Sequence, residues 1–324
     1  MGSPVAWSWV LVVLIAGSVA VAQREPVRVI FDTDIQSDVD DVGAVALLHA
    51  LADLGEAEIV AMGVSVTNPD SPLCLDALNT WYGRPDIPIG VVKGKGVKRG
   101  SSYAGGIAKE FPHRLKSADD APDAAQLYRK VLASQPDASV VLVTVGFLTN
   151  VANLLRTKPD KPDGLNGVEL VRRKVKVWVC MGGQFPEGRE CNLIRDPAAT
   201  AYAIEHWPTP IVFTGWEIGN RIVTGARLKQ TAKGSPVRRA YELYNGLKGR
   251  QSWDQTAVLY AVRGLGEWWS LQREGHLAVD AKGGNVWRKS PDKPHVHLVE
   301  KMAPEQVARL IEDLMMRPPA RKRH

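Results

Sequence analysis

The sequence predicts an α/β fold, an open, mostly parallel, Rossmann-like sheet with helices on both faces. The first observation is that short apolar runs rich in Val, Ile and Leu alternate with segments whose apolar residues recur at helical spacing. The second is that acids, amides and glycines follow directly after several of those runs. Alternating strands and helices form parallel sheets covered on both sides, and binding sites collect at the carboxyl ends of their strands. The polar residues after the runs are therefore the candidates for function.

Each element is assigned from its own pattern, in chain order. The run Val27 to Phe31 is short, apolar and ends in acids, which suits a buried strand. The expected strands cover 27–31, 58–66, 139–145, 175–180 and 211–213. The expected helices cover 42–54, 73–82, 148–155, 197–206 and 254–262. Beyond about Arg263 the pattern weakens, and it predicts strands or turns and a closing helix at 267–269, 283–285 and 303–316.

Composition and length favour a soluble globular protein. Of the 324 residues, 45% are hydrophobic and 23% are charged, which is too apolar for a disordered chain. No repeat supports a solenoid or a coiled coil, and no linker divides the chain. We therefore expect a single α/β domain over residues 23–316, followed by a basic tail at 317–324.

Residues 1–22 are predicted to be a signal peptide. The run 9–22 is apolar, charged residues follow it, and Ala20-Val21-Ala22 supplies a small-x-small cleavage pattern. This run is short for a membrane span, which needs ~20 apolar residues, and an uncleaved membrane anchor is the alternative. The mature protein is expected to be exported, either periplasmic or secreted, with no membrane contact after cleavage. That compartment permits disulfides, and Cys180 with Cys191 is the candidate pair.

The excess of positive charge does not indicate a nucleic-acid partner. The net charge is +6, and four of these charges lie in the tail at 317–324. A second basic stretch at 93–116 is rich in glycine and carries one Tyr and one Phe. We interpret it as a solvated loop rather than a nucleic-acid groove.

The main functional signal is a group of aspartates at the end of the first expected strand. Residues 32–41 read Asp-Thr-Asp-Ile-Gln-Ser-Asp-Val-Asp-Asp. A helix N-cap explains only part of this group. Carboxylates this close repel one another unless their pKa values rise or a cation lies among them. Oxygen ligands without His or Cys indicate a hard cation, calcium or magnesium.

Compatible polar residues follow other expected strands. They are Thr67-Asn68, Gly146 to Asn150, Met181-Gly182-Gly183 with Glu190 and Asn192 shortly after, and Trp253-Asp254 at the start of a late helix. Each has an ordinary structural explanation, such as a turn for Asn68 or a helix cap for Asp254. Together they place acids, amides and glycines at the ends of several strands, which indicates one shared site.

In this order the residues resemble the inosine-uridine preferring nucleoside hydrolase family. The resemblance rests on the aspartates at 32–41, Asn68, Val-Gly-Phe-Leu-Thr-Asn at 145–150, Met-Gly-Gly at 181–183, Glu-Cys-Asn at 190–192 with Asp196-Pro197, and Asp254. It extends from about Val27 to Val262 and implies the nucleoside hydrolase fold. The activity that it implies is calcium-dependent hydrolysis of the N-glycosidic bond of ribonucleosides to ribose and free base.

The resemblance also implies a metal site. One calcium ion is expected at the bottom of the pocket, and its protein ligands would be Asp34, Asp41, Asp254 and the backbone carbonyl of Val145. The ion would also bind the ribose 2′- and 3′-hydroxyls and one water. Asp34 is expected to take a proton from that water, which attacks C1′ of the ribose through an oxocarbenium-like state. Nearby negative charge would stabilise this state.

Four more residues receive substrate roles from the resemblance. Asp40 and Asn192 are expected to hold ribose hydroxyls. Glu190 would reach toward the 5′ side, and Asn68 would lie near the reacting sugar. Hydrogen bonding of this density is expected to reject deoxysugars, because groups in the site would be left unpaired.

The chain departs from the family pattern at three places. Two extra residues separate Asp34 from the Asp pair, and the added Asp38 either replaces a metal ligand or lies in a bulge. The segment 184–189 is shortened, so a sugar other than plain ribose is an option. Trp253 stands where many members have the His that protonates the leaving base.

The third departure favours purine nucleosides. Trp253 resembles the purine-specific branch of the family, in which stacking on the base is thought to ease its protonation. Trp81 or Tyr82 is the candidate for the other face of a sandwich, with ordinary packing as the alternative. The partner is then a small nucleoside, and purine salvage is the expected role. The oligomeric state stays open, with a homo-oligomer as one option.

Two other functions fit parts of the pattern. Asp32-Thr33-Asp34 after a strand also resembles haloacid-dehalogenase-type phosphatases, with Asp32 as nucleophile and Asp34 as acid. That family gives no role to Asp254 or Glu190. The other alternative is a non-catalytic exported protein that binds nucleosides or sugars. Retention of Asp34 with the Asp pair favours the hydrolase.

Overall fold

The computed structural model describes residue 2 and residues 25–159, 164–289 and 293–320. The expected signal peptide lies outside the described residues except for Gly2, and so does the end of the basic tail, 321–324. Among the described residues, no helix combines the length and apolarity that a membrane crossing requires.

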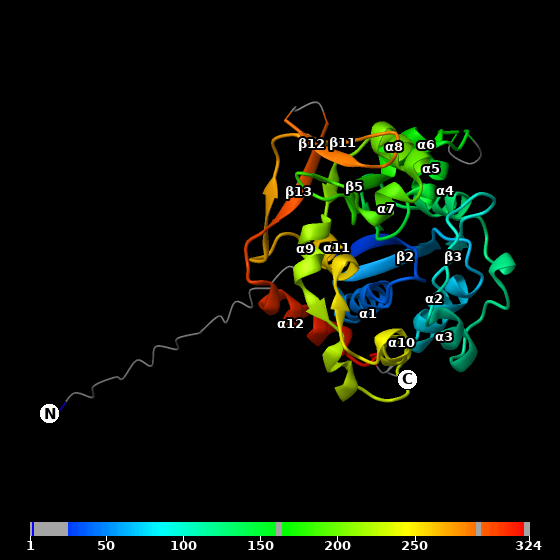
Figure 1. Ribbon diagram of the computed structural model, residues 1–324, viewed down its shortest axis with the longest axis vertical. Coiled ribbons are helices and arrows are strands. Elements are labelled where there is room, and N and C mark those ends of the chain that lie inside the picture. The colour runs from blue at the N-terminus through cyan, green and yellow to red at the C-terminus, as the bar shows by residue number, and fades with distance from the viewer. Residues whose placement is uncertain (1, 3–24, 160–163, 290–292, 321–324) are drawn as a thin grey trace.

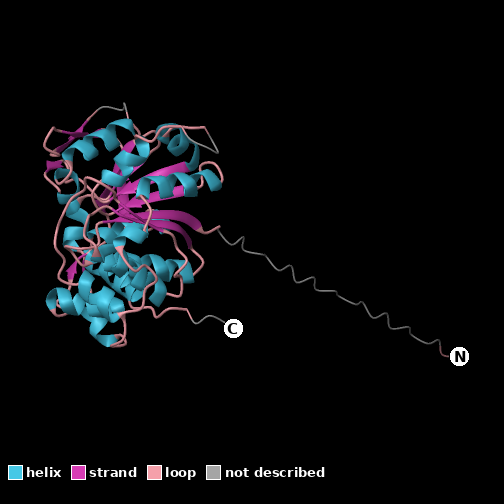
Figure 2. Ribbon diagram, turned by 90° about the vertical axis from the view of Figure 1, so that its right-hand side faces the viewer, coloured by secondary structure: helices cyan, strands magenta, loops and turns pink. Residues whose placement is uncertain are grey.

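A mostly parallel sheet forms the centre of the molecule (Figures 1 and 2). Within the described residues it has eight strands in the order β10-β13-β7-β5-β4-β1-β2-β3. All neighbouring strands are parallel except β10 and β13. Their bounds are β1 Val27–Thr33, β2 Ala57–Val64, β3 Ile89–Val91, β4 Val140–Thr144, β5 Val175–Cys180, β7 Ile211–Phe213, β10 Trp269–Gln272 and β13 His295–Glu300. The predicted fold class is therefore confirmed.

Helices cover both faces of this sheet (Figure 1). On one face lie α1 Asp40–Asp53, α2 Asp70–Trp81, α10 Pro236–Asn245, α11 Trp253–Arg263 and α12 Pro304–Met315. On the other lie α4 Ala124–Ser134, α5 Thr149–Leu155, α6 Gly167–Lys174 and α8 Pro197–His206. Each layer of helices has its own hydrophobic core against the sheet.

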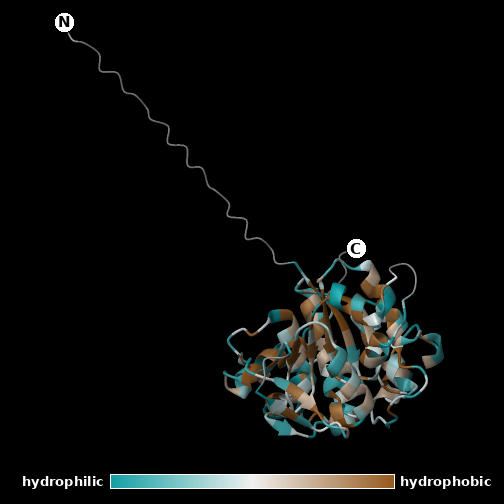
Figure 3. Ribbon diagram, turned by 90° about the horizontal axis from the view of Figure 1, so that it is seen from above, coloured by the Kyte–Doolittle hydropathy of each residue, from teal (hydrophilic) through white to brown (hydrophobic). Residues whose placement is uncertain are grey.

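The inner strands are mainly apolar because both of their faces are buried against helices. In β1, Val29 and Phe31 belong to the core shared with α1, whereas Ile30 belongs to the opposite core. Successive side chains of a strand point to opposite faces, so a strand between two helical layers needs apolar residues at every position. Figure 3 shows the result, with apolar residues in the interior and polar ones on the outer loops and helix faces.

Smaller elements connect the strands and helices of the two layers. They are α3 Ala104–Glu110, α7 Cys191–Ile194, α9 Trp216–Arg221, the short helices 118–120 and 226–230, the pair β8 Val223–Thr224 and β9 Arg250–Gln251, and the strands β6 Glu187–Gly188, β11 His276–Val279 and β12 Asn285–Arg288. Asn285 of β12 accepts a hydrogen bond from the Gln184 backbone N–H at 3.0 Å and donates to the Gln184 carbonyl at 2.8 Å. The C-terminal part of the chain thereby supports the shortened segment 184–189.

One prediction is wrong, and one possibility that the sequence left open is not met. The basic stretch 93–116 is not simply a solvated loop, because it contains α3 and the fully buried side chains of Tyr103 and Ile107. Its apolar residues are too few and too scattered to have indicated this. Cys180 and Cys191 are both free, so the candidate disulfide is absent among the described residues.

The order of the strands places the site. From β1 the chain continues outward through β2 and β3, whereas β4, β5 and β7 lie on the other side of β1. The connections after β1 and β4 therefore leave the sheet in opposite directions, which opens a crevice outside the carboxyl ends of these two strands. The aspartates of 32–41 follow β1, and Val145 follows β4.

Candidate active site

A cavity of about 200 Å³ opens at the carboxyl ends of β1, β4 and β5. Its lining comes from the loop after β1, the ends of β4 and β5, the starts of α7, α9 and α11, and the loop that follows β3. The lining residues are Asp34, Ser37, Asp38, Asp40, Asp41, Arg99, Val145, Met181, Glu190, Cys191, Asn192, Trp216, Arg250, Trp253 and Asp254. The structure thus brings together all the predicted site residues except Asn68 and Trp81.

Three buried carboxylates form the floor of this cavity. Asp40, Asp41 and Asp254 each place an oxygen within 4.8 Å of the others. Asp40 and Asp41 are the first residues of α1, and Asp254 lies in the first turn of α11, so both helix dipoles favour negative charge here. Thr33 donates a hydrogen bond to Asp41, and the Asp254 backbone N–H donates to Asp40 at 3.4 Å.

The carboxylates raise one another's pKa values. Burial and then the neighbouring Asp40 and Asp38 raise the pKa of Asp34 to about 8. Burial and then Asp38 raise the pKa of Asp40 to about 7. The pKa values of Asp41 and Asp254 lie well above the usual value, again because of burial first and the other aspartates second. A divalent cation would relieve this repulsion, and the all-oxygen donor set fits a hard ion such as calcium or magnesium.

Gly146, the residue after Val145, allows the end of β4 to approach Asp34 closely. A Cβ on Gly146 would lie 2.4 Å from the backbone N of Asp34, so only glycine permits this approach of the two strand ends. The Val145 backbone N–H donates to the Asp32 carbonyl at 2.8 Å, which continues the β1–β4 pairing to the cavity. The Val145 carbonyl accepts a hydrogen bond from Asn192 Nδ2 at 3.1 Å.

Glu190 and Asn192 form the wall next to this carbonyl. The Glu190 carboxylate caps α7, because it accepts hydrogen bonds from the backbone N–H groups of Asn192 at 2.8 Å and Leu193 at 3.3 Å. It also accepts one from the Gly183 N–H at 3.3 Å, and burial raises the pKa of Glu190 to about 7. Both residues are therefore held rigidly at the cavity edge.

Asp38 does not join the acid cluster. Its carboxylate pairs with Arg250 Nη2 at 2.8 Å and accepts a hydrogen bond from the Tyr244 hydroxyl at 2.7 Å. With 38% of its side chain exposed, it lies at the rim of the cavity. Of the two alternatives for Asp38, the geometry therefore supports a position in a bulge rather than a role as metal ligand. Asp40, expected only as a ribose contact, lies in the cluster instead, because the Asp254 N–H holds it there.

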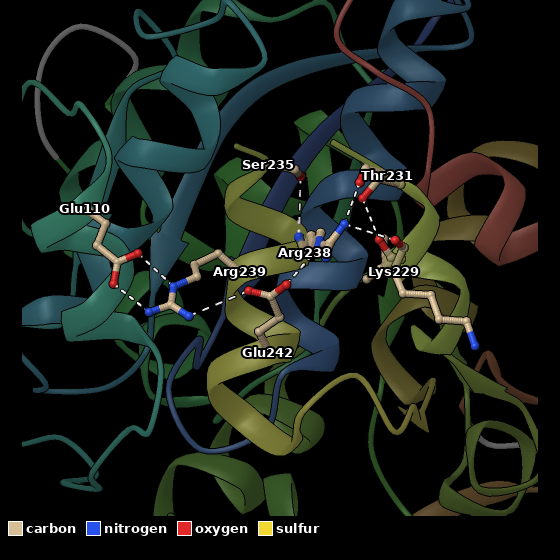
Figure 4. A network of polar contacts seen from close by, with 8 residues as sticks. Glu110, Lys229, Thr231, Ser235, Arg238, Arg239 and Glu242 are labelled. Carbon is tan, nitrogen blue, oxygen red and sulfur yellow. Dashed lines mark hydrogen bonds and ion pairs between the residues drawn. The ribbon is translucent and has the colours of Figure 1, made fainter. Parts of the chain in front are cut away.

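The helix that carries Tyr244 is tied to its neighbours by arginines (Figure 4). Arg239 of α10 binds both carboxylate oxygens of Glu110 in α3, at 2.7 and 2.9 Å. Arg238 binds Glu242 at 2.8 Å and the Thr231 carbonyl at 2.7 Å. These contacts fix α10 and thus the partner of Asp38.

Two tryptophans form another wall of the cavity. The rings of Trp253 and Trp216 are stacked, with centroids 6.4 Å apart and planes 28° apart. Trp253 Nε1 donates to the Trp216 carbonyl at 2.8 Å, and the Arg250 guanidinium lies 4.9 Å from the Trp253 ring centroid. An aromatic wall with an aligned cation is suited to a flat, electron-rich ring.

Comparison with known proteins identifies the family of the chain. The sequence model of the inosine-uridine preferring nucleoside hydrolase family matches residues 29–309. The chain belongs to this family. A nucleoside hydrolase of that name from Crithidia fasciculata is 27% identical over 205 residues, which are 58% of this chain and 60% of the relative. The match thus spans less than two thirds of that relative's length.

Solved structures of nucleoside hydrolases share the fold. The inosine-uridine preferring nucleoside hydrolase from Bacillus anthracis superposes with a TM-score of 0.68 at 18% identity, covering 90% of this chain and 99% of that one. An inosine-guanosine nucleoside hydrolase gives a TM-score of 0.68 at 19% identity, again covering 90% and 99%. At such identities the likeness concerns the fold alone.

Two residues that the nucleoside hydrolase resemblance indicated lie outside the cavity. The Asn68 side chain accepts from the Asp70 N–H at 2.9 Å in the turn before α2, and donates to the Arg99 carbonyl at 3.4 Å. Trp81 ends α2 and packs against the core, and Tyr82 is buried and stacked on His49. A position after a strand or at a helix end does not show by itself whether its side chain faces the site.

Three residues that line the cavity were missed by the sequence reasoning. Trp216 follows the expected strand 211–213 by three residues, so the strand-end argument could have found it. Arg99 follows β3, a strand of three residues with too short a pattern to be recognised. Arg250 is placed by the pairing of β9 with β8, for which the sequence has no signal that we can identify.

Asp32 excludes the phosphatase interpretation. It is fully buried, and it accepts hydrogen bonds from the Tyr128 hydroxyl and, at 2.8 Å, from Asn150 Nδ2. Burial raises its pKa to about 6, and it does not line the cavity. A nucleophile in this position could not reach a substrate, so Asp32 instead braces the strand ends beneath the nucleoside hydrolase site.

Proposed function

We propose that the protein hydrolyses the N-glycosidic bond of ribonucleosides, with purine nucleosides preferred, and that the reaction depends on calcium. The observation that carries the proposal is the cluster of Asp40, Asp41 and Asp254 at the floor of a cavity that Asp34 also lines. Membership of the nucleoside hydrolase family supports the reaction class.

The residues that would hold calcium are Asp41 and Asp254, with Asp34, Asp40 and the Val145 carbonyl beside them. Calcium takes six to eight oxygen ligands in flexible geometry, so a floor of several carboxylates suits it better than magnesium. When bound, the ion supplies positive charge that makes water more acidic and attracts the vicinal hydroxyls of a ribose.

The protein's own groups then carry the chemistry. Asp34 accepts a proton from the water that attacks C1′ of the ribose. The surrounding carboxylates stabilise the positive charge that develops on the sugar ring as the bond to the base breaks. Asn192 and Glu190 orient the sugar from the wall beside Val145, and the rigid capping of α7 keeps them in place.

The purine preference rests on the aromatic wall. No histidine lines the cavity within the described residues, so an imidazole acid is absent there. Trp253 and Trp216 offer stacking area to the leaving base, and a stacked purine exposes N7 to protonation from solvent. In this proposal Trp216, and not Trp81, is the second aromatic residue near the base.

The cellular location of the protein is a separate proposal from its activity. We propose export through the segment 1–22, on the pattern of its residues alone, with an uncleaved anchor as the alternative. The boundaries of the single domain, 23–316, stay a prediction.

The experiment uses protein that begins at Gln23, incubated with inosine, adenosine, guanosine, uridine and cytidine. Free ribose is measured with calcium and with a chelator. We expect calcium-dependent release that is faster from the purine nucleosides. Asp34→Asn should abolish release while part of the binding remains, and Asp119→Asn, an exposed change of the same kind, should retain activity. If no nucleoside is cleaved although calcium binds, a substrate with a modified sugar or a non-catalytic binding protein becomes the better account.

A further inference from the structure

The loop between β3, the edge strand of the sheet, and α3 brings Arg99 to the cavity. The Thr67 backbone N–H donates to the Val97 carbonyl at 3.1 Å, and Asn68 donates to the Arg99 carbonyl at 3.4 Å. These contacts attach the loop to the segment that follows β2. They fix the backbone of Arg99, and its side chain lines the cavity.

The Arg99 guanidinium has few hydrogen-bond acceptors around it among the described residues. Its Nη1 donates to Cys191 Sγ at 3.5 Å, a weak acceptor, and among the described residues no carboxylate pairs with it. The other arginine of the cavity, Arg250, is paired with Asp38 at 2.8 Å. A guanidinium has five N–H donors in a planar fork, so most of those of Arg99 are available to a ligand.

The position of Arg99 relative to the other walls suggests which part of a substrate it would meet. It contacts Cys191, the residue after Glu190, whereas the aromatic wall of Trp253 and Trp216 is built by other elements. With the base on the tryptophans and the ribose over the acid cluster, the 5′ carbon falls beside Glu190 and Arg99. This placement rests on the proposed function.

The segment 184–189 does not occupy the end of the cavity beside Glu190 and Arg99. Residues 184–189 do not line the cavity. Gly188 pairs with Asn285 in β12, and Gln184 exchanges two hydrogen bonds with the same asparagine. A group larger than a hydroxyl on the 5′ carbon would therefore meet a free guanidinium there.

We propose that Arg99 binds a 5′-phosphate, so that the preferred substrates are 5′-phosphorylated ribonucleosides. The planar fork of arginine matches phosphate oxygens in a bidentate manner. The carboxylates of Asp34 and Glu190 lie near this end and repel an anion, so the Arg99 guanidinium must offset their charge for a phosphate to bind. The bond from C1′ to the base breaks, the oxygen of water bonds to C1′, and Asp34 takes the proton of that water. The base leaves with the electron pair and gains a proton, and ribose 5-phosphate is the other product.

The test compares inosine 5′-monophosphate with inosine in the presence of calcium. We expect kcat/KM to be higher for the monophosphate, and Arg99→Gln to lower the monophosphate-to-inosine ratio by about tenfold or more. Arg99→Lys should retain part of the ratio. Lys98→Gln removes the same charge from an exposed neighbour that does not line the cavity, and it should leave the ratio unchanged.

A binding measurement separates this inference from the proposed function. Calorimetry with ribose 5-phosphate and with ribose should show tighter binding of the phosphate, and Arg99→Gln should remove most of the difference. Cleavage of inosine without any advantage of the monophosphate overturns the inference and leaves the hydrolase standing. Tighter, Arg99-dependent binding of ribose 5-phosphate without any cleavage keeps the anion site and overturns the hydrolase. If a variant fails to fold, the wild-type protein still tests the inference, through inosine 5′-monophosphate against inosine and ribose 5-phosphate against ribose.

Discussion

The Asp254 backbone N–H donates a hydrogen bond to the Asp40 carboxylate, and this 3.4 Å contact joins residues 214 positions apart in the chain. It links the first turns of α1 and α11, the two helices whose N-termini converge under the cavity. Since both helix N-termini carry partial positive charge, they hold acids that would otherwise repel one another. The acid cluster is therefore a product of the tertiary fold and not of the local sequence 32–41 alone.

Asp41→Asn should weaken calcium binding by at least about tenfold, because it removes a charged ligand from a site with few others. Calorimetric titration of metal-free protein with calcium measures this. Asp38→Asn is the matched comparison, since its carboxylate faces Arg250 and Tyr244 at the rim. It should change the affinity by less than about threefold. An equal loss in both variants would make Asp38 a ligand after all.

Calcium should stabilise the protein more at pH 8 than at pH 5. The pKa values of Asp34, about 8, and Asp40, about 7, lie above the usual 3.8. The metal-free folded chain therefore keeps protons that the unfolded chain releases, and its free energy of unfolding falls as pH rises from about 4 to about 8. Bound calcium removes this penalty because it favours the ionised carboxylates. Melting temperatures with and without calcium measure the difference, and a larger gain at pH 5 would contradict the assignment.

Trp253→Ala should lower kcat/KM for purine nucleosides by about 10- to 100-fold, since base–aromatic stacking contributes ~1–3 kcal/mol. The loss for uridine should be smaller, because a pyrimidine offers less area to stack. Trp253→Phe should restore part of the purine activity. The readout is ribose release under initial-rate conditions. If both classes of nucleoside lose the same factor, Trp253 supports the wall without selecting the base.

Gly146→Ala should destabilise the protein and impair activity. The new Cβ would lie 2.4 Å from the backbone N of Asp34, so the ends of β1 and β4 must separate at a cost of ~1–3 kcal/mol. Gly234→Ala is the control, because no atom lies within 4 Å of the position that its new methyl group would take. Chemical denaturation measures both. Wild-type stability and turnover in Gly146→Ala would show that the approach of the two strand ends is not required.

The fold was predictable where local pattern and burial agree. The helix α8 and the strands β5 and β7 begin and end where the sequence predicts, since each is an apolar or helical run with clear boundaries. The short strand β3 and the helix α3 were not predicted, because three residues show no period and the basic stretch hides two buried side chains.

The site was predictable where residues directly follow strands. Asp34 and Val145 come immediately after β1 and β4, and parallel strands bring such positions together. Asn68 also follows β2, but its side chain bonds within the turn before α2 and to the Arg99 carbonyl, which its position in the sequence does not reveal. Arg99 and Arg250 reach the cavity through tertiary contacts, about which the sequence around them carries no information.

The most direct test of the central claim is the return of catalysis with calcium. Metal-free protein, incubated with inosine and with inosine 5′-monophosphate, should release sugar at least about a hundredfold more slowly than the same sample after calcium is added back. Asp34→Asn should stay inactive at saturating calcium. Equal release with and without the ion, or full activity of Asp34→Asn, would contradict a calcium-dependent hydrolase with Asp34 as its base.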